Sequence, residues 1–164
     1  MKEIIPKRMT AQLDGDFAMF LIGFRINRLL KVHQWWPVFR SMRPMVNELR
    51  ANPESGFLHA EIGWGNPIIM VQYWRSPDDL VRYASDRDAA HLPAWAKFNK
   101  RIGSNGDVGI WHETYVIPAG AHESVYNNMP RFGLAQAGGH IPAEGRWANA
   151  VSRLEVNQEE STCG

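Results

Sequence analysis

The 164-residue chain has 45% hydrophobic and 21% charged residues, with seven Trp and seven Phe, which excludes the class of disordered, highly charged chains. A chain of this length can bury roughly two thirds of its unfolded surface in one domain. We expect this domain over residues 8–146 and a flexible C-terminal extension over 147–164. The 18 Lys and Arg balance 17 Asp and Glu, so no overall field attracts nucleic acid or an anionic membrane, and we expect neither as a partner.

Cys163 is the single cysteine, so the chain forms no internal disulfide and no cysteine-based metal site. Residues 1–16 lack the apolar run of a secretory signal. The apolar run 17–24 is much shorter than the ~20 residues that cross a bilayer. We therefore expect a cytoplasmic protein without a membrane span.

The first half of the chain predicts three strands and one long helix. Residues 17–24 form a continuous apolar run, which is typical of a buried strand. Large apolar residues then recur at steps of three and four over 32–49 and predict an amphipathic helix, with Pro37 in its first turn and Pro44 expected to kink or divide it. Residues 57–64 and 68–74 flank a Gly-Asn-Pro turn and predict a hairpin.

The second half begins with a helix-start signal. Ser76 is a natural N-cap, and the acidic residues that follow it predict a helix over 77–90. After an interruption at Leu92-Pro93, a helical stripe continues to about residue 102. Residues 108–117 then alternate as a strand does. We expect the rest of the chain from residue 120 to be loop-rich and residues 155–164 to be frayed.

The order strand, helix, strand, strand, helix, strand predicts an α+β fold of the ferredoxin-like split βαβ type, with helices on one face of an antiparallel sheet. Phe, Trp and Tyr side chains occupy both faces of these strands. The face without helices would expose a large apolar patch in a monomer, so we expect a second subunit to cover it in a homodimer.

Several stretches resemble the dimeric α/β-barrel superfamily of small monooxygenase-like proteins: Tyr73-Trp74-Arg75-Ser76, which leads into a helix, and the later Ala90-His91. Other stretches are similar to a family described as monooxygenase family proteins or as a domain of unknown function: Leu92-Pro93-Ala94-Trp95, Gly109-Ile110-Trp111-His112-Glu113-Thr114-Tyr115-Val116 and Asn128-Met129-Pro130-Arg131-Phe132-Gly133-Leu134-Ala135. The likeness covers roughly residues 8–146.

This resemblance implies a dimeric α/β barrel and the chemistry found in that superfamily, which includes cofactor-free quinol-forming and haem-degrading monooxygenases. In the haem-degrading members a histidine late in the helix after the third strand ligates the iron. The matching position here is His91, and Tyr83 falls near the place of an aromatic residue that lies against the haem. The spacing between the two is about two residues shorter here.

Two histidines are candidate catalytic residues. His91 is either an axial ligand or acid/base group, or a helix-terminal residue that interacts with the last carbonyls of its helix. His112 shares a strand row with Ile110 and Val116, so we expect its ring to be buried, lining a pocket or satisfied within a core or interface. Gln72 and Trp74 are the expected neighbours of His112.

The remaining candidates bind rather than react. Tyr73, Trp74 and Trp111 would shape an aromatic pocket or belong to the core. Arg25 would meet a substrate carboxylate or haem propionate, or snorkel at the surface. His59 and Glu61 share one strand face and form a charge pair or two metal ligands; because two ligands do not complete a site, we expect no metal.

Dinucleotide, phosphate-loop and zinc-peptidase motifs are absent from the sequence. We therefore expect a monooxygenase-like enzyme that acts on a hydrophobic, aromatic small molecule between sheet and helices. His112 and His91 would be its catalytic residues, and Tyr73, Trp74, Trp111, Gln72, Tyr83 and Arg25 would contact the substrate. The cofactor is either none or haem b. The alternatives are a non-catalytic dimer that binds haem or an apolar ligand, and a structural dimer without a ligand.

Overall fold

The computed structural model describes residues 3–86, 96 and 105–162. Within them the secondary structure runs β1 (Ile5–Gln12), β2 (Phe17–Ile26), α1 (Val32–Ala51), η1 (Pro53–Ser55), β3 (Phe57–Gly63), β4 (Ile68–Trp74), α2 (Pro77–Ser85), β5 (Val108–Ile117), β6 (Tyr126–Met129), α4 (Leu134–Ala137), β7 (Gly139–Pro142), η2 (Gly145–Trp147) and α5 (Ala150–Thr162).

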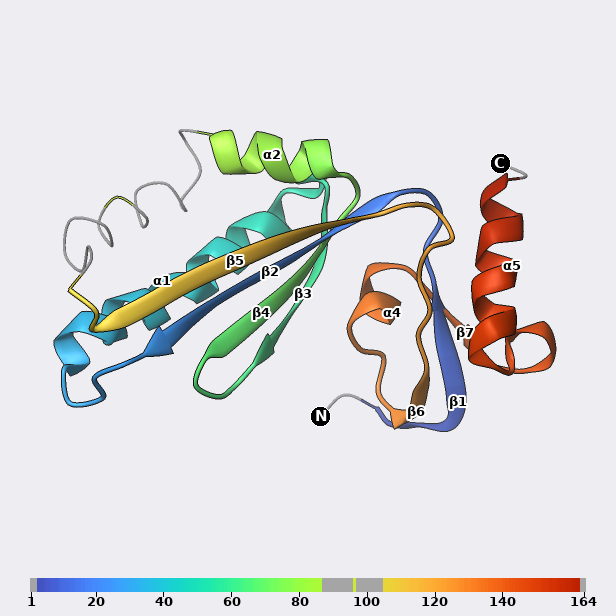
Figure 1. The fold of residues 1–164 in the computed structure, drawn as a ribbon, viewed down its shortest axis with the longest axis horizontal. Coiled ribbons are helices and arrows are strands. Elements are labelled where there is room, and N and C mark those ends of the chain that lie inside the picture. Colours follow the sequence, from blue (N-terminus) through green and yellow to red (C-terminus); the bar gives the residue numbers. More distant parts are fainter. Residues whose placement is uncertain (1–2, 87–95, 97–104, 163–164) are drawn as a thin grey trace.

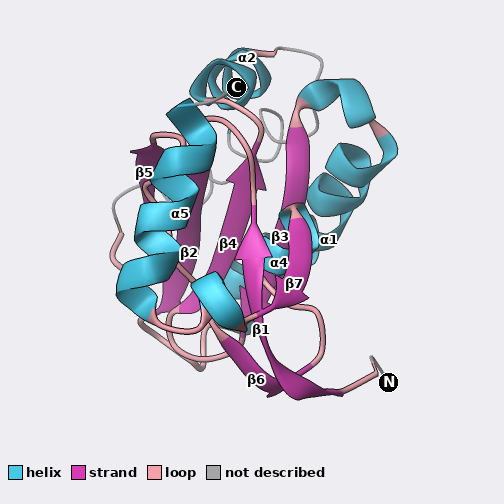
Figure 2. Ribbon diagram, turned by 90° about the vertical axis from the view of Figure 1, so that its right-hand side faces the viewer, coloured by secondary structure: helices cyan, strands magenta, loops and turns pink. Residues whose placement is uncertain are grey.

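Four strands form an antiparallel sheet in the order β3-β4-β2-β5. The α1 and α2 helices lie on one face of this sheet, and among the described helices only the short α4 reaches the other face, at its β3 edge, so we call it the helix-free face (Figures 1 and 2). The strands predicted over 17–24 and 108–117 and the hairpin predicted over 57–64 and 68–74 are confirmed. This is the predicted ferredoxin-like α+β arrangement, in which the chain passes twice through a strand-helix-strand unit.

The strand period of two decides which residues form the core between helices and sheet. Along β4, residues 68, 70, 72 and 74 are buried while the intervening residues are half-buried. Trp74 is fully buried and packs edge-on against Phe57, with ring centroids 5.5 Å apart. Val46 and Leu49 of α1 and Leu80 of α2 complete this core. Hydrophobic burial on this face therefore fixes the register of the sheet.

The α1 helix is continuous from Val32 to Ala51 with both prolines inside it, so the predicted division at Pro44 is wrong. Pro37 was predicted in the first turn of this helix, but it lies beyond that turn. Both prolines sit at exposed positions, where water can satisfy the carbonyl groups that they leave without a partner. The buried Val46 and Leu49 hold the C-terminal half of the helix against the sheet.

The α2 helix begins as predicted and ends earlier. The Asp79 backbone N–H donates to the Ser76 side chain at 3.1 Å, which confirms Ser76 as the N-cap. The helix ends at Ser85, and Asp86 has extended backbone angles, so the predicted end at residue 90 is wrong. Residues 87–90 and most of the predicted stripe over 95–102 lie outside the described residues.

A second, three-stranded sheet has the order β6-β1-β7 and is antiparallel throughout. It lies at one end of the larger sheet, with α5 beside it (Figure 1). The sequence analysis missed β1 and predicted only loops after residue 120. The frayed end predicted for residues 155–164 is wrong over most of that range, because α5 runs to Thr162.

Polar contacts explain why α5 forms although its sequence shows no apolar stripe. Arg153 is 2% exposed, and its Nε donates to the Glu123 carboxylate at 2.6 Å. A second guanidinium nitrogen donates to the Trp147 carbonyl at 2.9 Å. The Asn157 side chain donates to the His122 carbonyl at 2.7 Å. A buried ion pair and a side-chain amide therefore hold the helix where apolar packing usually does.

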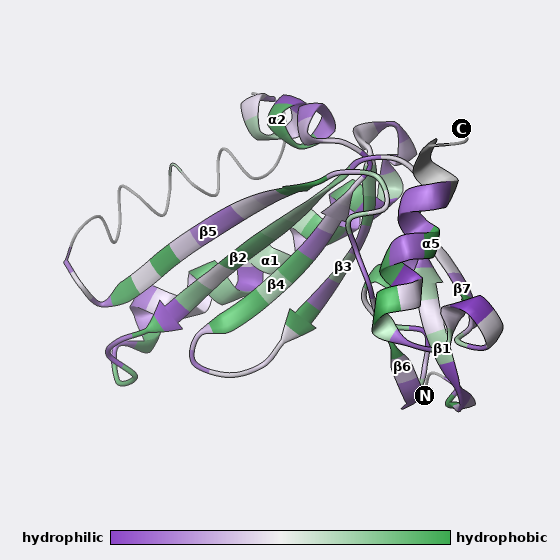
Figure 3. Ribbon diagram, turned by 45° about the vertical axis from the view of Figure 1, so that its right-hand side comes forward, coloured by the Kyte–Doolittle hydropathy of each residue, from purple (hydrophilic) through white to green (hydrophobic). Residues whose placement is uncertain are grey.

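The two sheets meet at a small apolar cluster of Ala11, Phe17, Leu134 and Ala135. Tyr73, Ile117 and Tyr126 pack around it. Figure 3 shows the helix-free face of the large sheet and the second sheet that abuts it at one end. None of the described helices is both long and apolar enough to cross a bilayer.

Gly56 joins η1 to β3 with a left-handed backbone (φ 79°), and an added Cβ there would overlap the Asp79 carboxylate. Asp79 is buried and accepts hydrogen bonds from Arg75 at 2.9 Å and from Arg82. The hydrogen bond from Arg75 is the main cause that holds the pKa of the Asp79 carboxyl below its usual range. Burial opposes this shift, and the hydrogen bonds of Arg82 and Ser76 add to it. Gly56 therefore makes room for the ion-pair cluster that anchors α2.

We expect Gly56→Ala to lower the free energy of unfolding by about 2–4 kcal/mol, because backbone strain and displacement of the Asp79 carboxylate add together. Gly15→Ala is the matched control. Gly15 has a similar φ of 74° and open space around it, so it should cost only about 1 kcal/mol. Urea unfolding measures both. Equal losses in the two variants would show that the contact with Asp79 contributes nothing.

His122 is buried against Phe17, with ring centroids 5.4 Å apart. Neither ring nitrogen has a hydrogen-bond partner among the described residues. Burial lowers the pKa of His122 from its ordinary value of 6.5, and the charge of Asp14 opposes this only in part. The imidazole is therefore held neutral in the folded protein.

Because the folded pKa of His122 lies below 6.5, the unfolded chain takes up this proton first as the pH falls. The full contribution to stability is present above pH 6.5 and declines below it. We expect His122→Leu to reduce the loss of unfolding free energy between about pH 7.5 and about pH 5. His33→Leu, at an exposed position, is the control and should keep the wild-type loss. Equal pH dependence of all three proteins would contradict the neutral, buried imidazole.

Candidate functional site

An apolar cavity of about 240 Å³ lies where the helix-free face of β3 and β4 meets the turn before α4. Sheet residues form its floor and the turn forms its side. The lining residues are Glu61, Ile62, Gly63, Ile69, Val71, Tyr73, Phe132 and Gly133. Its polar groups gather at one end, around Tyr73 and Glu61, which is the usual layout of a small-molecule site.

Tyr73 is the predicted substrate-contacting residue that lines this cavity. Burial, followed by unfavourable electrostatic interaction with Tyr126 and with the Glu61 carboxylate, raises the pKa of Tyr73 to about 12. A hydrogen bond from the Leu134 backbone N–H opposes this shift only in part. The phenol therefore stays protonated at neutral pH and can donate a hydrogen bond to a bound oxygen atom.

Glu61 and His59 form the second polar group of the site. They share one face of β3, as the sequence predicts, and the His59 Nε2 lies 2.9 Å from the Glu61 Oε1. The Gly133 backbone N–H also donates to this carboxylate oxygen, at 3.4 Å. The pair is a hydrogen-bonded couple, and no metal-binding group of three or more His, Cys, Asp or Glu occurs among the described residues.

A further pair of rings supports the cavity from the second sheet. Tyr126 accepts a hydrogen bond from the Ala135 N–H at 3.4 Å and packs edge-on against His140 at 5.6 Å. Burial, followed by the charge of Arg131, lowers the pKa of His140. The sequence analysis assigned no role to Tyr126, Phe132 or Gly133. The only signal for Phe132 and Gly133 was the 128–135 stretch that carries the family resemblance, and Tyr126 lies outside it.

Gln72 and Trp74 lie on the opposite face of β4, in the core between sheet and helices. The Trp74 Nε1 donates to the Gln72 Oε1 at 3.0 Å. The Gln72 amide is directed to the Met70 sulfur at 3.2 Å. Both residues belong to the core. For Trp74 this was the expected alternative to a place in an aromatic pocket.

His112 is exposed in the single chain, so its ring lies in neither the core nor the two cavities, and the expected alternative of an interface position stays a prediction. It lies on β5, an edge strand, on the sheet face opposite the cavity, with its ring 5.6 Å from that of Phe20. Trp111 points to the cavity face but packs across Gly23, two strands away from β4. Arg25 is exposed at the end of β2 and does not line the cavity. A catalytic role of His112 stays a hypothesis.

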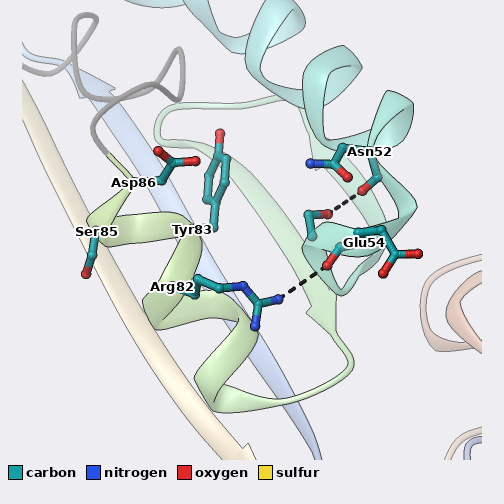
Figure 4. Close-up of a pocket in the computed structure, with 7 residues that line it drawn as sticks. Asn52, Glu54, Arg82, Tyr83, Ser85 and Asp86 are labelled. Carbon is teal, nitrogen blue, oxygen red and sulfur yellow. Dashed lines mark hydrogen bonds between the residues drawn. The ribbon is translucent and has the colours of Figure 1, made fainter.

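A larger, polar cavity of about 520 Å³ lies between the C-terminal end of α1, η1 and α2 (Figure 4). Its described lining includes Tyr83, Arg82, Asp86 and Glu54. Tyr83 also packs on Trp74, with ring centroids 5.4 Å apart. Burial, followed by the charges of Glu48 and Asp86, raises the pKa of Tyr83 to about 12.

The described lining of this second cavity offers no haem ligand. Haem iron takes a His, Cys, Met or tyrosinate ligand in a largely apolar pocket. The described lining contains no His, Cys or Met, and the Tyr83 phenol stays protonated. His91, the predicted ligand, lies outside the described residues. We therefore derive no reaction step through haem.

Comparison with known proteins identifies related sequences. The monooxygenase af470 of Aspergillus fumigatus is 25% identical in an alignment 150 residues long, which covers 78% of this chain and 53% of that protein. The chain thus spans about half the length of this relative. The crystal structure of aldoxime dehydratase (OxdRE) with butyraldoxime matches at a TM-score of 0.63 and 16% identity, over 84% of this chain and 42% of that one. This likeness concerns the fold alone.

SnoaB, a cofactor-independent oxygenase from Streptomyces nogalater, matches at a TM-score of 0.45 and 12% identity, over 61% of this chain and 91% of that one. The family model described as "Monooxygenase af470-like" matches residues 17–134. These residues run from the start of β2 to the start of α4 and contain the whole large sheet and the turn that closes the apolar cavity. The chain belongs to the Monooxygenase af470-like family.

Proposed function

We propose that this protein is a monooxygenase-like enzyme that oxidises a hydrophobic, electron-rich aromatic molecule in the cavity at Tyr73. The observation that carries the proposal is the apolar floor of this cavity with a neutral phenol and a carboxylate at one end. Membership of the Monooxygenase af470-like family supports the class of reaction. The apolar lining supports an aromatic ligand, because Ile69, Val71 and Phe132 offer apolar contact and few polar groups.

The proposed reaction needs no external reductant. Glu61 accepts the hydroxyl proton of a substrate phenol, and His59 holds this carboxylate in place. The phenolate transfers electrons to molecular oxygen, and a C–O bond forms at the ring carbon opposite the hydroxyl. Loss of water then leaves a quinone, so that phenol and O₂ give quinone and H₂O. One oxygen atom enters the product and the other leaves as water.

Tyr73 contributes orientation and charge stabilisation in this scheme. Its O–H stays protonated and donates toward the oxygen on which negative charge develops. The cavity excludes water from the anion, which strengthens this hydrogen bond. Tyr73 and Glu61 are therefore the residues that touch substrate in the proposal, in place of the His112 and His91 of the sequence-based hypothesis.

We also propose that the chain acts as a homodimer. The helix-free face of the large sheet extends beyond the cavity, and its apolar side chains include Leu21 and Ile69. These side chains are half-buried in the single chain, and a second copy on this face would bury them and close the cavity.

We expect Glu61→Gln to lower kcat/KM for oxygen uptake by about 100-fold and Tyr73→Phe by about tenfold, because a proton acceptor and a hydrogen-bond donor are lost. Oxygen-electrode assays with a panel of monohydric and polycyclic phenols that carry hydrogen on the ring carbon opposite the hydroxyl measure both. His112→Ala should keep the wild-type rate within about twofold if the cavity is the site. A sharp loss in His112→Ala with normal Glu61→Gln activity would transfer catalysis to His112.

The same panel separates an enzyme from a binding protein. If the ligands quench tryptophan fluorescence but no variant and no wild-type sample consumes oxygen, the protein binds an apolar ligand without transforming it. Such a result would contradict the proposed reaction and leave the ligand class intact. An unchanged signal in Tyr73→Phe and Glu61→Gln alike would remove the cavity from both functions.

Sedimentation equilibrium should give twice the 18.7 kDa chain mass if the sheet face pairs two copies. Leu21→Arg, which places a charge in that face, should shift the equilibrium toward the monomer by about tenfold or more. Val116→Arg is the control, because Val116 is 58% exposed on the opposite face of the edge strand. A wild-type monomer at all concentrations would contradict the dimer.

A further inference from the structure

Five large apolar side chains project into solvent at the end of the large sheet away from α5. They are Leu29, Leu30, Val32, Trp36 and Trp64, which we call the tip patch. Leu30 is 96% exposed, and Leu29 and Trp64 are each 69% exposed. Soluble proteins show single exposed apolar residues, but a cluster of this kind marks an interaction surface.

The tip patch combines two turns that are distant in sequence, and Figure 1 shows both at the end of the large sheet away from α5. Asn66, in the turn after β3, accepts from the Ile26 N–H at 3.0 Å and donates to the Ile26 carbonyl at 3.1 Å. Phe39 bridges the two tryptophans. Its ring stacks on Trp36 at 5.4 Å and lies 5.7 Å from Trp64. Trp36, Phe39 and Trp64 therefore form one continuous aromatic surface beside the turn that carries Leu29 and Leu30.

Hydrogen bonds fix the turn between β2 and α1, which carries Leu29 and Leu30. The Trp35 Nε1 donates to the Leu29 carbonyl at 3.0 Å. The N–H groups of Asn27 and Arg28 both donate to the Asp107 carbonyl, at 3.1 and 3.3 Å. The Lys31 N–H then donates back to the Arg28 carbonyl at 3.1 Å. A turn fixed on both sides presents its two leucines without a further loss of backbone entropy on binding.

The surface around the tip patch is basic. Between Asp16 and Glu48 the sequence contains five Lys or Arg and no Asp or Glu. Arg28 and Lys31 pair with the buried Asp107 at 3.3 and 2.7 Å, so one carboxylate is shared by two cations. Arg40 and Arg43 lie on the same exposed side of α1 as Trp36, one and two turns further along. Net charge near zero thus conceals a local excess of positive charge.

We propose that the tip patch docks on the surface of an anionic lipid bilayer. The leucines and tryptophans would enter the headgroup region, where Trp and Leu side chains are favourable, while Arg40 and Arg43 would meet lipid phosphates. A symmetric contact with a second copy would place the same arginines against one another, which disfavours that occupant. The expectation of no membrane partner rested on net charge alone and does not bear on a segregated patch.

This proposal does not depend on the proposed reaction. The tip patch and the cavity share no residue. A peripheral contact of this kind would bring the protein to the phase in which an apolar aromatic substrate dissolves. Either proposal can fail while the other holds.

Co-sedimentation of the purified full chain with vesicles tests the contact. Vesicles of phosphatidylcholine with about a third phosphatidylglycerol should bind the protein. Pure phosphatidylcholine vesicles should bind it at least about tenfold more weakly. Leu29→Ser/Leu30→Ser and Arg40→Gln/Arg43→Gln should each weaken binding about tenfold. Binding should also fall when sodium chloride is raised to about 0.5 M.

Val151→Ser is the matched control, because Val151 is 66% exposed on α5 at the other end of the molecule, and it should bind as the wild type does. Far-UV circular dichroism checks that each variant is folded. Absence of binding by the wild type, or equal binding by the wild type and Leu29→Ser/Leu30→Ser, would overturn the proposal. A self-association that Leu29→Ser/Leu30→Ser abolishes, without vesicle binding, would assign the tip patch to a second copy and also overturn it.

Discussion

The apolar contact between the two sheets is the constraint on which the candidate site depends. Phe17 and Ala11 pack against Leu134 and Ala135, and this packing brings the turn before α4 over the helix-free face of the large sheet. Phe132 and Gly133 then close one side of the cavity. The backbone N–H groups of this turn also reach the Tyr73 phenol and the Glu61 carboxylate. The large sheet alone would offer these two side chains on an open surface, and the second sheet turns that surface into a cavity.

The alternation of β4 assigns opposite tasks to neighbouring residues. Trp74 and Gln72 face the helices and hydrogen bond to each other within the core, whereas Tyr73 and Val71 face the cavity. A shift of the register by one residue would exchange these roles completely. The burial of Trp74 therefore positions Tyr73 as firmly as any contact inside the cavity does. This explains how a chemical group on a sheet face can be held without a dense polar network around it.

The large sheet could be predicted from sequence because each of its strands carries its own period, and Ser76 marks the start of α2. The second sheet could not, since β1 pairs through Met9 with Tyr126 and through Ala11 with His140, more than a hundred residues away. The α5 helix is held by the ion pair between Arg153 and Glu123, which leaves no apolar stripe to read. Tyr73 and the pairing of His59 with Glu61 could be predicted because they follow from the period of a single strand. The turn that encloses them comes from a distant part of the chain, so it could not be predicted. The exposure of His112 in the single chain could not be predicted, because period alone does not reveal that β5 is an edge strand.

The polar groups of the cavity gather at one end, and this asymmetry fixes how a flat ligand can bind. A ring placed on Val71 and Ile69 meets the Tyr73 O–H and the Glu61 carboxylate at a single edge. In the proposed reaction, an oxygen substituent at that edge would lose its proton to Glu61 and accept a hydrogen bond from Tyr73. The rest of the ring contacts only apolar side chains and the Gly63 and Gly133 backbone, where no polar group competes for it. Because a buried polar atom without a partner is unfavourable, a ligand in the reverse orientation would strand its oxygen in the apolar end. Selection of orientation therefore follows from solvation, before any reaction begins.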